Sequence, residues 1–387
     1  MKQDSNLRNN LKSIRTRLGM SQQDLANLAS VTRQTISGVE SGQYAPSVAI
    51  SLRLAKALGC QVEELFWLEQ DLPEIEAVLA KSAPNIQQLR VSLARVGGQW
   101  IAYPLIGKDA FRQDMIPADG EGERQINTNI NTNINTNTNK IRVRLLDDNV
   151  DNLYNTVVIA GCSPVISLWA RATERWHPQL RVHFHFANSM AALHSLSRGE
   201  AHIAGMHLYD PKTGEYNTPF VREVLAGKEA VLITLGVWEE GIMVQSGNPK
   251  DIKNITDLVA KKATIINREE GSGSRFLLEQ TLTKEHLSFQ DLQGFEQIVY
   301  SHQDVASAIA SGIVDAGIST ASVAITFGLD FIPLHQSRYD LVILKEHLDE
   351  SPVKQLLSTL DHRLVHSQLE VLGGYDISKI GQIVATI

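Results

Sequence analysis

The chain has 387 residues, of which 43% are hydrophobic and 20% charged, a composition typical of a globular protein with two or three domains. No apolar run reaches the roughly 20 residues that a membrane-spanning helix needs, and the first residues lack the apolar stretch of a secretory signal. Two isolated cysteines, Cys60 and Cys162, indicate reduced thiols rather than disulfides. We therefore expect a cytoplasmic protein without membrane contact.

Charge is unevenly distributed along the chain. The net charge is −7, but residues 1–60 carry eight Lys/Arg against three Asp/Glu, and the rest carries 28 against 40. A basic segment on an acidic body favours contact with a polyanion. Charge alone is equally consistent with a basic surface that is simply solvated.

The first 67 residues have the pattern of short helices. Apolar residues recur at helical spacing over 7–18, and Gly19 ends that helix. Ser21, with Asp24 three residues later, predicts the start of a second helix. Residues 32–40 form a third, and two further helices follow. The residues expected to face inward in the last three are Ile36, Val39, Leu52, Leu54, Ala55, Leu58, Val62, Leu65 and Phe66.

The stretch "MSQQDLANLASVTRQTISGVESGQYAPSVAISLRLAKALGCQVEELF" resembles the Xre/Cro-type helix-turn-helix family. The resemblance implies that residues 32–40 form a recognition helix, whose first side chains reach base edges in the major groove. Arg33 suits guanine and Gln34 adenine, while Gln22 suits a backbone phosphate. A small helical bundle used for protein contacts is the alternative. The implied DNA-binding residues are Gln22, Thr32, Arg33, Gln34 and Ser37.

Residues 69–150 are expected to form a small connector that contains β-structure. Residues 73–80 look helical, 91–105 read as a β-hairpin around a Gly-Gly pair, and 141–146 as a further strand. Between them lies an Asn/Thr repeat, 126–139, within "QINTNINTNINTNTNK". Asparagine and threonine cannot build a core, so we interpret the repeat as a disordered loop.

From residue 151 to 387, β-type runs alternate with helical patterns, which predicts parallel α/β layers. A weak internal echo predicts two similar lobes, and two long β-type stretches, 231–245 and 329–344, are suited to cross between them as a hinge. The segments "GCSP", "NSMAALHSLSRGEAHIAGMHLYDPKTGEYN" and "NREEGSGSR" resemble the periplasmic-binding-protein-like fold. The resemblance is strongest to its oxyanion-binding members and to related domains of molybdenum-cofactor proteins. The expected fold class is thus multidomain: an all-α helix-turn-helix head (1–68), the β-containing connector and a two-lobed α/β domain.

Three predicted strand ends of this domain carry small hydroxyl residues at helix starts. Ligands bind at the carboxyl ends of strands in open α/β sheets, and helix dipoles there attract anions. The resemblance matches Ser163 and Ser189 to oxyanion contacts of the first lobe and residues 272–274 to those of the second. Arg275 offers a bidentate fork. The alternative for each serine is an ordinary N-cap. The candidate ligand-binding residues are Ser163, Asn188, Ser189, Ser272, Gly273, Ser274 and Arg275.

Other chemistries find less support. The glycine-rich loop lacks the Gly-Lys-Ser/Thr ending of a phosphate-binding Walker loop, and no nucleophile elbow is visible. His183 and His185 share one strand face, but no third ligand stands at a standard spacing, so we expect a polar strand face and no metal site. No catalytic residues are predicted.

These patterns predict a one-component transcriptional regulator rather than an enzyme. Its expected partners are a double-stranded DNA operator, a second copy of the chain, since such heads read paired half-sites, and a small anion. Molybdate or tungstate leads among the anions, and no covalently bound cofactor is expected. An enzyme of cofactor biosynthesis and a sensor of a small organic anion remain alternatives. The basic head and the missing signal argue against a transport protein.

Overall fold

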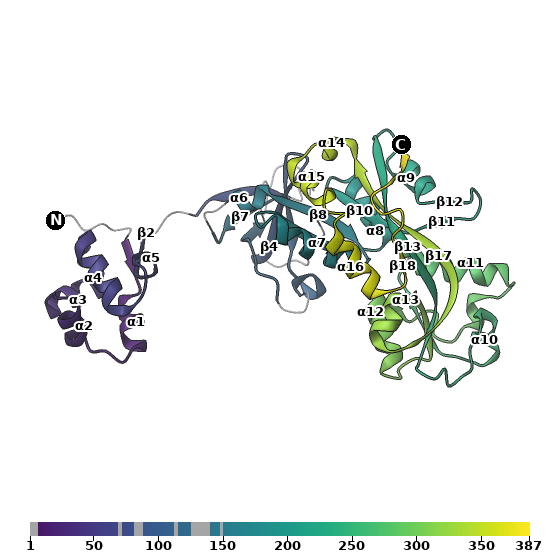
Figure 1. Cartoon of the computed structure of the whole chain (residues 1–387), viewed down its shortest axis with the longest axis horizontal. Helices are drawn as coiled ribbons and strands as arrows, with labels where there is room; N and C mark the ends of the chain where they lie inside the picture. The colour runs from purple at the N-terminus through teal and green to yellow at the C-terminus, as the bar shows by residue number, and fades with distance from the viewer. Residues whose placement is uncertain (1–6, 69–71, 81–87, 112–114, 125–139, 148–149) are drawn as a thin grey trace, which may run out of the picture. The chain divides into compact units, whose positions relative to one another are not determined.

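The computed structural model describes residues 7–68, 72–80, 88–111, 115–124, 140–147 and 150–387. The chain divides into two compact units, Met1–Pro73 and Glu74–Ile387. Figure 1 shows the helical unit and the larger α/β unit in chain order. The Asn/Thr repeat, 126–139, lies outside the described residues. None of the described helices is both long and apolar enough to cross a bilayer.

The described part of the first unit contains five short helices, as predicted. Hydroxyl side chains cap α2, α3 and α4 through Ser21, Thr32 and Ser47, and the capping box with Asp24 is present. The helices are α1 (Leu11–Arg17), α2 (Gln22–Leu28), α3 (Arg33–Glu40), α4 (Val48–Leu58) and α5 (Val62–Leu65).

Two details of this unit differ from the prediction. Leu7 is not helical but lies in β1 (Leu7–Asn9), which pairs antiparallel with β2 (Phe66–Leu68). Residues at the two ends of the unit thus satisfy each other's backbone hydrogen bonds, which outweighs the helical spacing of the leucine. Leu52, expected inside, is 58% exposed, because α4 turns Leu54, Ala55 and Leu58 to the core.

The connector is a closed barrel with the strand order β3-β5-β4-β6-β7. The predicted hairpin (β4, Gln88–Val96, and β5, Gln99–Pro104) and the strand at 141–146 (β7, Lys140–Leu145) are confirmed, and β6 (Gly120–Arg124) is additional. The helix expected over 73–80 is wrong, because β3 (Glu74–Leu79) occupies this segment.

Tertiary pairing explains why β3 is a strand. It pairs antiparallel with β7 and parallel with β5, so without it the barrel would stay open. Its burial alternates, with Ala77 and Leu79 buried and Glu74 and Glu76 exposed, which is the period of a strand. The helical propensity of Glu, Ala and Leu is too small to resist this pairing.

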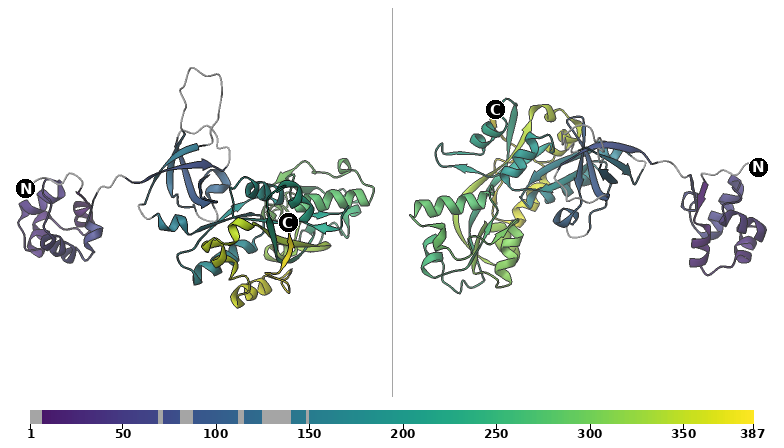
Figure 2. Two further views of the ribbon diagram at one scale, coloured as in Figure 1. Left: turned by 90° about the horizontal axis from the view of Figure 1, so that it is seen from above. Right: turned by 180° about the vertical axis from the view of Figure 1, so that it is seen from behind.

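The barrel packs on the adjoining α/β lobe (Figure 2). Tyr103 of β5 is buried, and its hydroxyl donates to the carbonyl of Glu200 at 2.6 Å. Arg181 donates to Asp119 and to the carbonyl of Leu93. The connector is therefore a docked domain rather than a spacer.

A ten-stranded sheet forms the two-lobed domain, with the order β15-β14-β16-β13-β17-β10-β8-β9 and with β18 and β19 also paired to β13. The pairs β8–β9, β8–β10, β14–β15 and β14–β16 are parallel, as predicted. The strands are β8 (Thr156–Gly161), β9 (Arg181–Phe186), β10 (Ile203–Met206), β13 (Ala230–Val244), β14 (Ile265–Arg268), β15 (Ile298–Val299), β16 (Ala316–Thr320), β17 (Asp330–Leu344), β18 (Tyr375–Asp376) and β19 (Ile383–Thr386).

Helices accompany the strands of each lobe. The first lobe contains α7 (Val165–Trp176), α8 (Ser189–Ser197) and α9 (Thr218–Val224), and the second contains α10 (Ile255–Ala260), α11 (Gly273–Lys284), α12 (His302–Ala310) and α13 (Ala321–Phe327). Further short elements are α6 (Asp151–Tyr154), β11 (Tyr209–Asp210), β12 (Glu215–Tyr216), α14 (Lys345–Leu348), α15 (Ser351–Leu357) and α16 (Arg363–Leu372).

The strands β13 and β17 run through both lobes, as Figure 1 shows. They pair antiparallel from Ala230–Leu344 at one end to Val244–Asp330 at the other. The two long strands predicted to cross between lobes are thus present. The pairing is interrupted at two places, between Thr234 and Gly236 and between Glu240 and Gly241.

Candidate functional site

The first turn of α3 presents the polar residues predicted to contact DNA. Ile36 and Val39 are buried and anchor the helix in the core, so its opposite face is fixed towards solvent. Thr32 caps the helix by accepting from the backbone N–H of Thr35 at 3.1 Å. The exposed residues of this face are Thr32, Arg33, Gln34 and Ser37.

Gln22 is placed differently from its predicted neighbours. Its side-chain nitrogen donates to Glu40 at 2.8 Å, so this nitrogen is already engaged within the head. Glu40 also forms a buried ion pair with Arg15 of α1, at 2.6 Å. Burial raises the pKa of Glu40, but hydrogen bonds from Arg15 and Gln22 outweigh it and lower this pKa below the ordinary value. The pair fixes the end of α3 against α1.

In the two-lobed domain, residues from the predicted strand ends surround His207. It follows β10, and its Nε2 lies 3.5 Å from the Cys162 sulfur, which follows β8. Its backbone N–H donates to the Ser189 hydroxyl at 3.2 Å. Gly273 lies against the imidazole ring so closely that any Cβ there would collide with it. The sequence places these residues far apart, and the sheet brings them together.

Glu240 on β13 is the charged partner of His207. The carboxylate accepts from His207 Nδ1 at 3.1 Å, from the Ser274 hydroxyl at 2.8 Å and from the Ser337 hydroxyl at 2.6 Å. Burial alone would disfavour both charges, but Glu240 raises the pKa of His207 to about 10 and His207 lowers that of Glu240 to about 2. The centre of the domain therefore holds a buried imidazolium–carboxylate pair.

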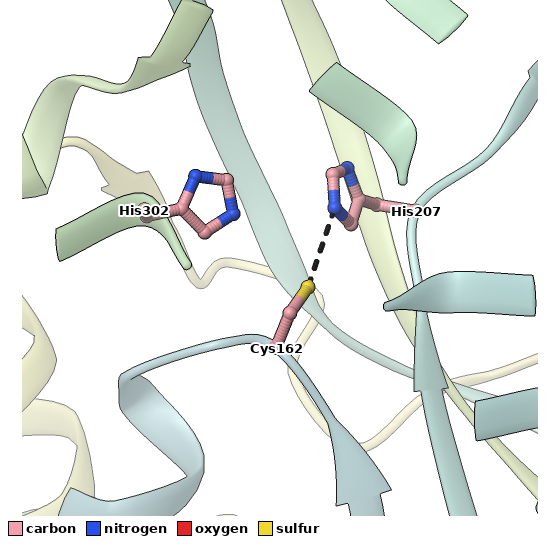
Figure 3. A group of neighbouring side chains, drawn as sticks. All are labelled: Cys162, His207 and His302. Carbon is pink, nitrogen blue, oxygen red and sulfur yellow. Dashed lines mark hydrogen bonds between the residues drawn. The ribbon is translucent and has the colours of Figure 1, made fainter. Parts of the chain in front are cut away.

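His302 faces this pair from the second lobe. It begins α12, is fully buried, and its Nδ1 lies 3.1 Å from the Ser319 hydroxyl. Burial, and then the nearby charge of Arg268, hold the pKa of His302 well below its usual value, so the ring is neutral. Figure 3 shows the rings of His207 and His302 facing each other beside the Cys162 thiol.

Two buried nitrogens around this centre, Nε2 of His302 and Nε1 of Trp238, have no hydrogen-bond partner among the described residues. The Trp238 ring centroid lies 5.6 Å from that of His302, 4.7 Å from that of His207 and 5.8 Å from that of Tyr375. Unsatisfied buried polar groups are rare and costly. Their concentration at one place is typical of a site that a ligand completes.

The other predicted ligand residues have identifiable structural duties. Ser163, fully buried, accepts from the backbone N–H of Val165 at 3.3 Å. Ser272 and Asn188 cap α11 and α8, which is the alternative considered for these positions. The Arg275 guanidinium pairs with Glu279 at 2.8 Å and stacks on Phe295. This structure therefore does not bring the predicted fork to the centre.

Sequence reasoning missed Glu240 and the roles of His207 and His302. Each carried a signal: Glu240 interrupts a long apolar β-type run, and both histidines stand at strand ends, as the serines do. By contrast, His183 and His185 pack against Tyr103 of the barrel, with ring centroids 4.7 and 6.2 Å away. The fold instead brings His207 of the first lobe close to His302 of the second, two histidines that the sequence analysis did not pair.

The lobes are in contact over this centre. Asn188 donates to the carbonyl of Glu270 at 3.1 Å, and the backbone N–H of Met190 donates to the carbonyl of Gly271 at 3.2 Å. Two pockets in the described part of the domain, about 450 and 730 Å³, are lined by other residues.

Comparison with known proteins agrees with this architecture. A helix-turn-helix family matches residues 11–65, and a family described as the PBP superfamily domain matches residues 170–361. The HTH-type transcriptional regulator YgzD of Bacillus subtilis is 40% identical over 65 residues, which are 17% of this chain and 98% of that protein. The B. subtilis protein YvgK is 36% identical over 200 residues, 51% of this chain, and the chain covers 64% of YvgK.

Solved structures similar to the chain include a putative phosphate transporter substrate-binding protein with bound phosphate from Clostridium perfringens. It has a TM-score of 0.43 and 13% identity, covering 55% of this chain and 97% of that one. The regulatory domain of CcmR from Synechocystis, in complex with 2-PG, has a TM-score of 0.42 and 14% identity, covering 53% and 95%.

The helical head, the barrel and the two-lobed body define a DNA-binding regulator that carries a ligand-binding domain. The chain belongs to the Xre-type helix-turn-helix transcriptional regulators, with a PBP-like domain fused to the DNA-binding head.

Proposed function

We propose that the protein is a one-component transcriptional regulator of the cytoplasm, in which a small anion bound between the lobes changes how a homodimer binds its operator. The observation that carries this proposal is the fusion itself: one chain joins a DNA-reading helix to a two-lobed domain with an incomplete buried polar centre. A ligand that binds one arrangement of the lobes better than another shifts the population between them.

The chemistry of the centre favours a ligand held by neutral donors. The Trp238 N–H is buried without a partner in the part of the chain that the structure describes. The positive charge of His207 is balanced by Glu240, and Arg275 is engaged by Glu279. Such a site suits a compact oxyanion, for which we put molybdate and tungstate first, ahead of a small organic anion.

An enzyme is the second candidate, favoured by one observation. Cys162, His207 and Glu240 form a thiol–imidazole–carboxylate relay, with 3.5 Å and 3.1 Å between successive partners, the order found in cysteine nucleophiles. Against it, the Cys162 side chain is buried, only 2% exposed, and faces His302 as well. Turnover of a bound ester or amide, lost in Cys162→Ala, would support the enzyme.

Two measurements test the regulator. Selection from random DNA with the full chain yields an operator, and thermal unfolding is then followed with molybdate, tungstate, sulfate, phosphate and small organic acids. A bound anion raises the unfolding temperature by mass action. We expect this rise to be lost in Trp238→Phe and retained in Trp100→Phe, a control in the barrel. If no DNA sequence is selected, with or without an anion, the regulator is wrong. If only organic acids raise the unfolding temperature, molybdate and tungstate are excluded as ligands.

A further inference from the structure

Three side chains at the lobe interface present metal-ligating atoms to one another. The Cys162 sulfur and one nitrogen each of His207 and His302 all lie within 4.8 Å of one another, and the three residues are buried. Figure 3 shows them converging from three separate segments of the domain. No other group of three His, Cys, Asp or Glu residues with this geometry exists in the described residues.

The outer nitrogen of each ring is already held by another side chain. His207 Nδ1 is 3.1 Å from Glu240, and His302 Nδ1 is 3.1 Å from the Ser319 hydroxyl. Both rings therefore turn Nε2 towards Cys162, and a bound metal ion would displace the protons of His207 Nε2 and of the Cys162 thiol to solvent. Histidines that bind metals almost always have such a second partner, which fixes the ring and its tautomer.

His302 supplies independent support for a missing partner. The residue is fully buried, and its Nε2 finds no hydrogen bond among the residues that the structure describes. A relay of Cys162, His207 and Glu240 alone has no use for this nitrogen. A metal ion at the centre would give it a partner.

One of the three distances matches the edge of a tetrahedral metal site. With metal–sulfur and metal–nitrogen bonds of about 2.3 and 2.0–2.1 Å, the sulfur and a nitrogen lie about 3.5 Å apart along one edge of the tetrahedron. The separation of the Cys162 sulfur from His207 Nε2 is 3.5 Å. One thiolate and two imidazoles are borderline to soft ligands, which select Zn²⁺, Co²⁺ or Cu⁺ over Mg²⁺ or Ca²⁺.

We propose that Cys162, His207 and His302 form a site for a thiophilic transition-metal ion, Zn²⁺ first, with a fourth position open to a ligand oxygen. Cys162 and His207 belong to the first lobe and His302 to the second. The ion therefore joins the lobes and holds them together. The metal site stands without the proposed function; only its effect on operator binding rests on that function.

Titration of the metal-free full chain with Co²⁺ tests the site, because thiolate ligation produces a charge-transfer absorption. We expect one Co²⁺ per chain, displaced by Zn²⁺. Cys162→Ser abolishes the absorption band, and His302→Gln weakens Co²⁺ affinity by at least ~100-fold. Ser319→Ala, which removes only the partner of His302, weakens it about 10–100-fold. The control is Cys60→Ser, the other free cysteine, which leaves the titration unchanged.

The proposal is overturned if the wild-type chain binds no stoichiometric Co²⁺ or Zn²⁺, or if both Cys162→Ser and His302→Gln retain wild-type affinity. Circular dichroism of each variant separates loss of ligation from loss of folding, and Ser319→Ala gives a graded readout where a ligand variant unfolds. Operator binding is measured on the same samples. If the chain binds metal but no operator, the proposed regulator is wrong and the metal site stands. If it binds an operator but no metal, the metal site is wrong and the regulator stands.

Discussion

The side chains around His207 show how the tertiary structure determines the roles of single residues. Ser189, Gly273 and Ser274 were predicted as ligand donors, but in the structure they act on the buried pair. Ser189 holds the His207 backbone, Gly273 leaves room for its ring, and Ser274 donates to Glu240. Small residues at strand ends thus allow a large charged pair to be buried between helix starts.

At the same scale, Arg33 and Gln34 should determine operator choice. Both are exposed at the start of α3, so replacing them leaves the core intact. We expect Arg33→Ala to cost about 1–3 kcal/mol of binding to the selected operator and to relax specificity at one base. Lys56→Ala, an exposed cation in the last turn of α4, is the matched control. Fluorescence anisotropy with operator and mutated operators measures both; equal losses in the two variants would contradict base reading by Arg33.

The buried Arg15–Glu40 pair should control the stability of the head. Removing one partner leaves an uncompensated buried charge, so Glu40→Ala should lower the free energy of unfolding by about 3 kcal/mol. The control is Glu63→Ala, an exposed carboxylate in α5, with an expected effect within about 0.5 kcal/mol. Urea unfolding of the full chain, followed at the head's helices, measures the change. If Glu40→Ala is as stable as wild type, the Arg15–Glu40 pair does not contribute to the stability of the head.

The same pair predicts a pH dependence. The pKa of Glu40 is lower in the folded state than its ordinary value of 4.5. Its contribution is therefore fully present above that value and is lost as the pH falls through the folded pKa. We expect the stability difference between wild type and Glu40→Ala to be constant from pH 7 to 5.5 and to shrink below pH 4.5. If the stability difference between the two proteins grows as the pH falls, the pKa of Glu40 is raised by folding and not lowered.

At the scale of elements, the barrel illustrates where pattern reasoning succeeds. The strands β4, β5 and β7 were predicted because their runs of alternating or continuous apolar residues suit β-structure over those lengths. β3 was predicted as a helix because its Glu, Ala and Leu suit a helix locally. Its pairing with β5 and β7 is non-local, and no window of sequence contains it.

The contact between barrel and first lobe should stabilise the domain through Tyr103. Its buried hydroxyl donates to the Glu200 carbonyl at 2.6 Å. Tyr103→Phe keeps the ring on His183 but leaves that carbonyl without this donor, so we expect a loss of about 1–2 kcal/mol. Tyr154→Phe is the control, because Tyr154 is 48% exposed. Thermal unfolding of both variants measures the difference; equal unfolding temperatures would show that the hydrogen bond contributes nothing net.

At the scale of the whole molecule, the proposed homodimer predicts how the heads bind DNA. Two heads of a homodimer read half-sites on one face of the duplex, about 10 base pairs apart or a multiple of that. Inserting five base pairs between half-sites turns one of them to the opposite face, and we expect at least ~10-fold weaker binding. Inserting ten should restore most of it. Anisotropy titrations with the three operators measure this; indifference to spacing would show that a single head binds alone.

The sequence by itself determined the parts whose information is local. Caps, turns and apolar spacing define the five helices of the head, and the exposed face of α3 follows from that spacing alone. The alternation of strands and helices likewise defines the two-lobed class. Local hydrogen bonds and helical or β periodicity suffice for these features.

Only the tertiary structure decided the composition of the central site. Cys162, His207, Glu240 and His302 come from four separate segments, and their meeting depends on the order of strands in the sheet and on the closure of the lobes. It also decided that Arg275 pairs with Glu279 and that β3 completes a barrel. These outcomes depend on contacts between residues distant in the chain, which side-chain spacing along the sequence does not encode.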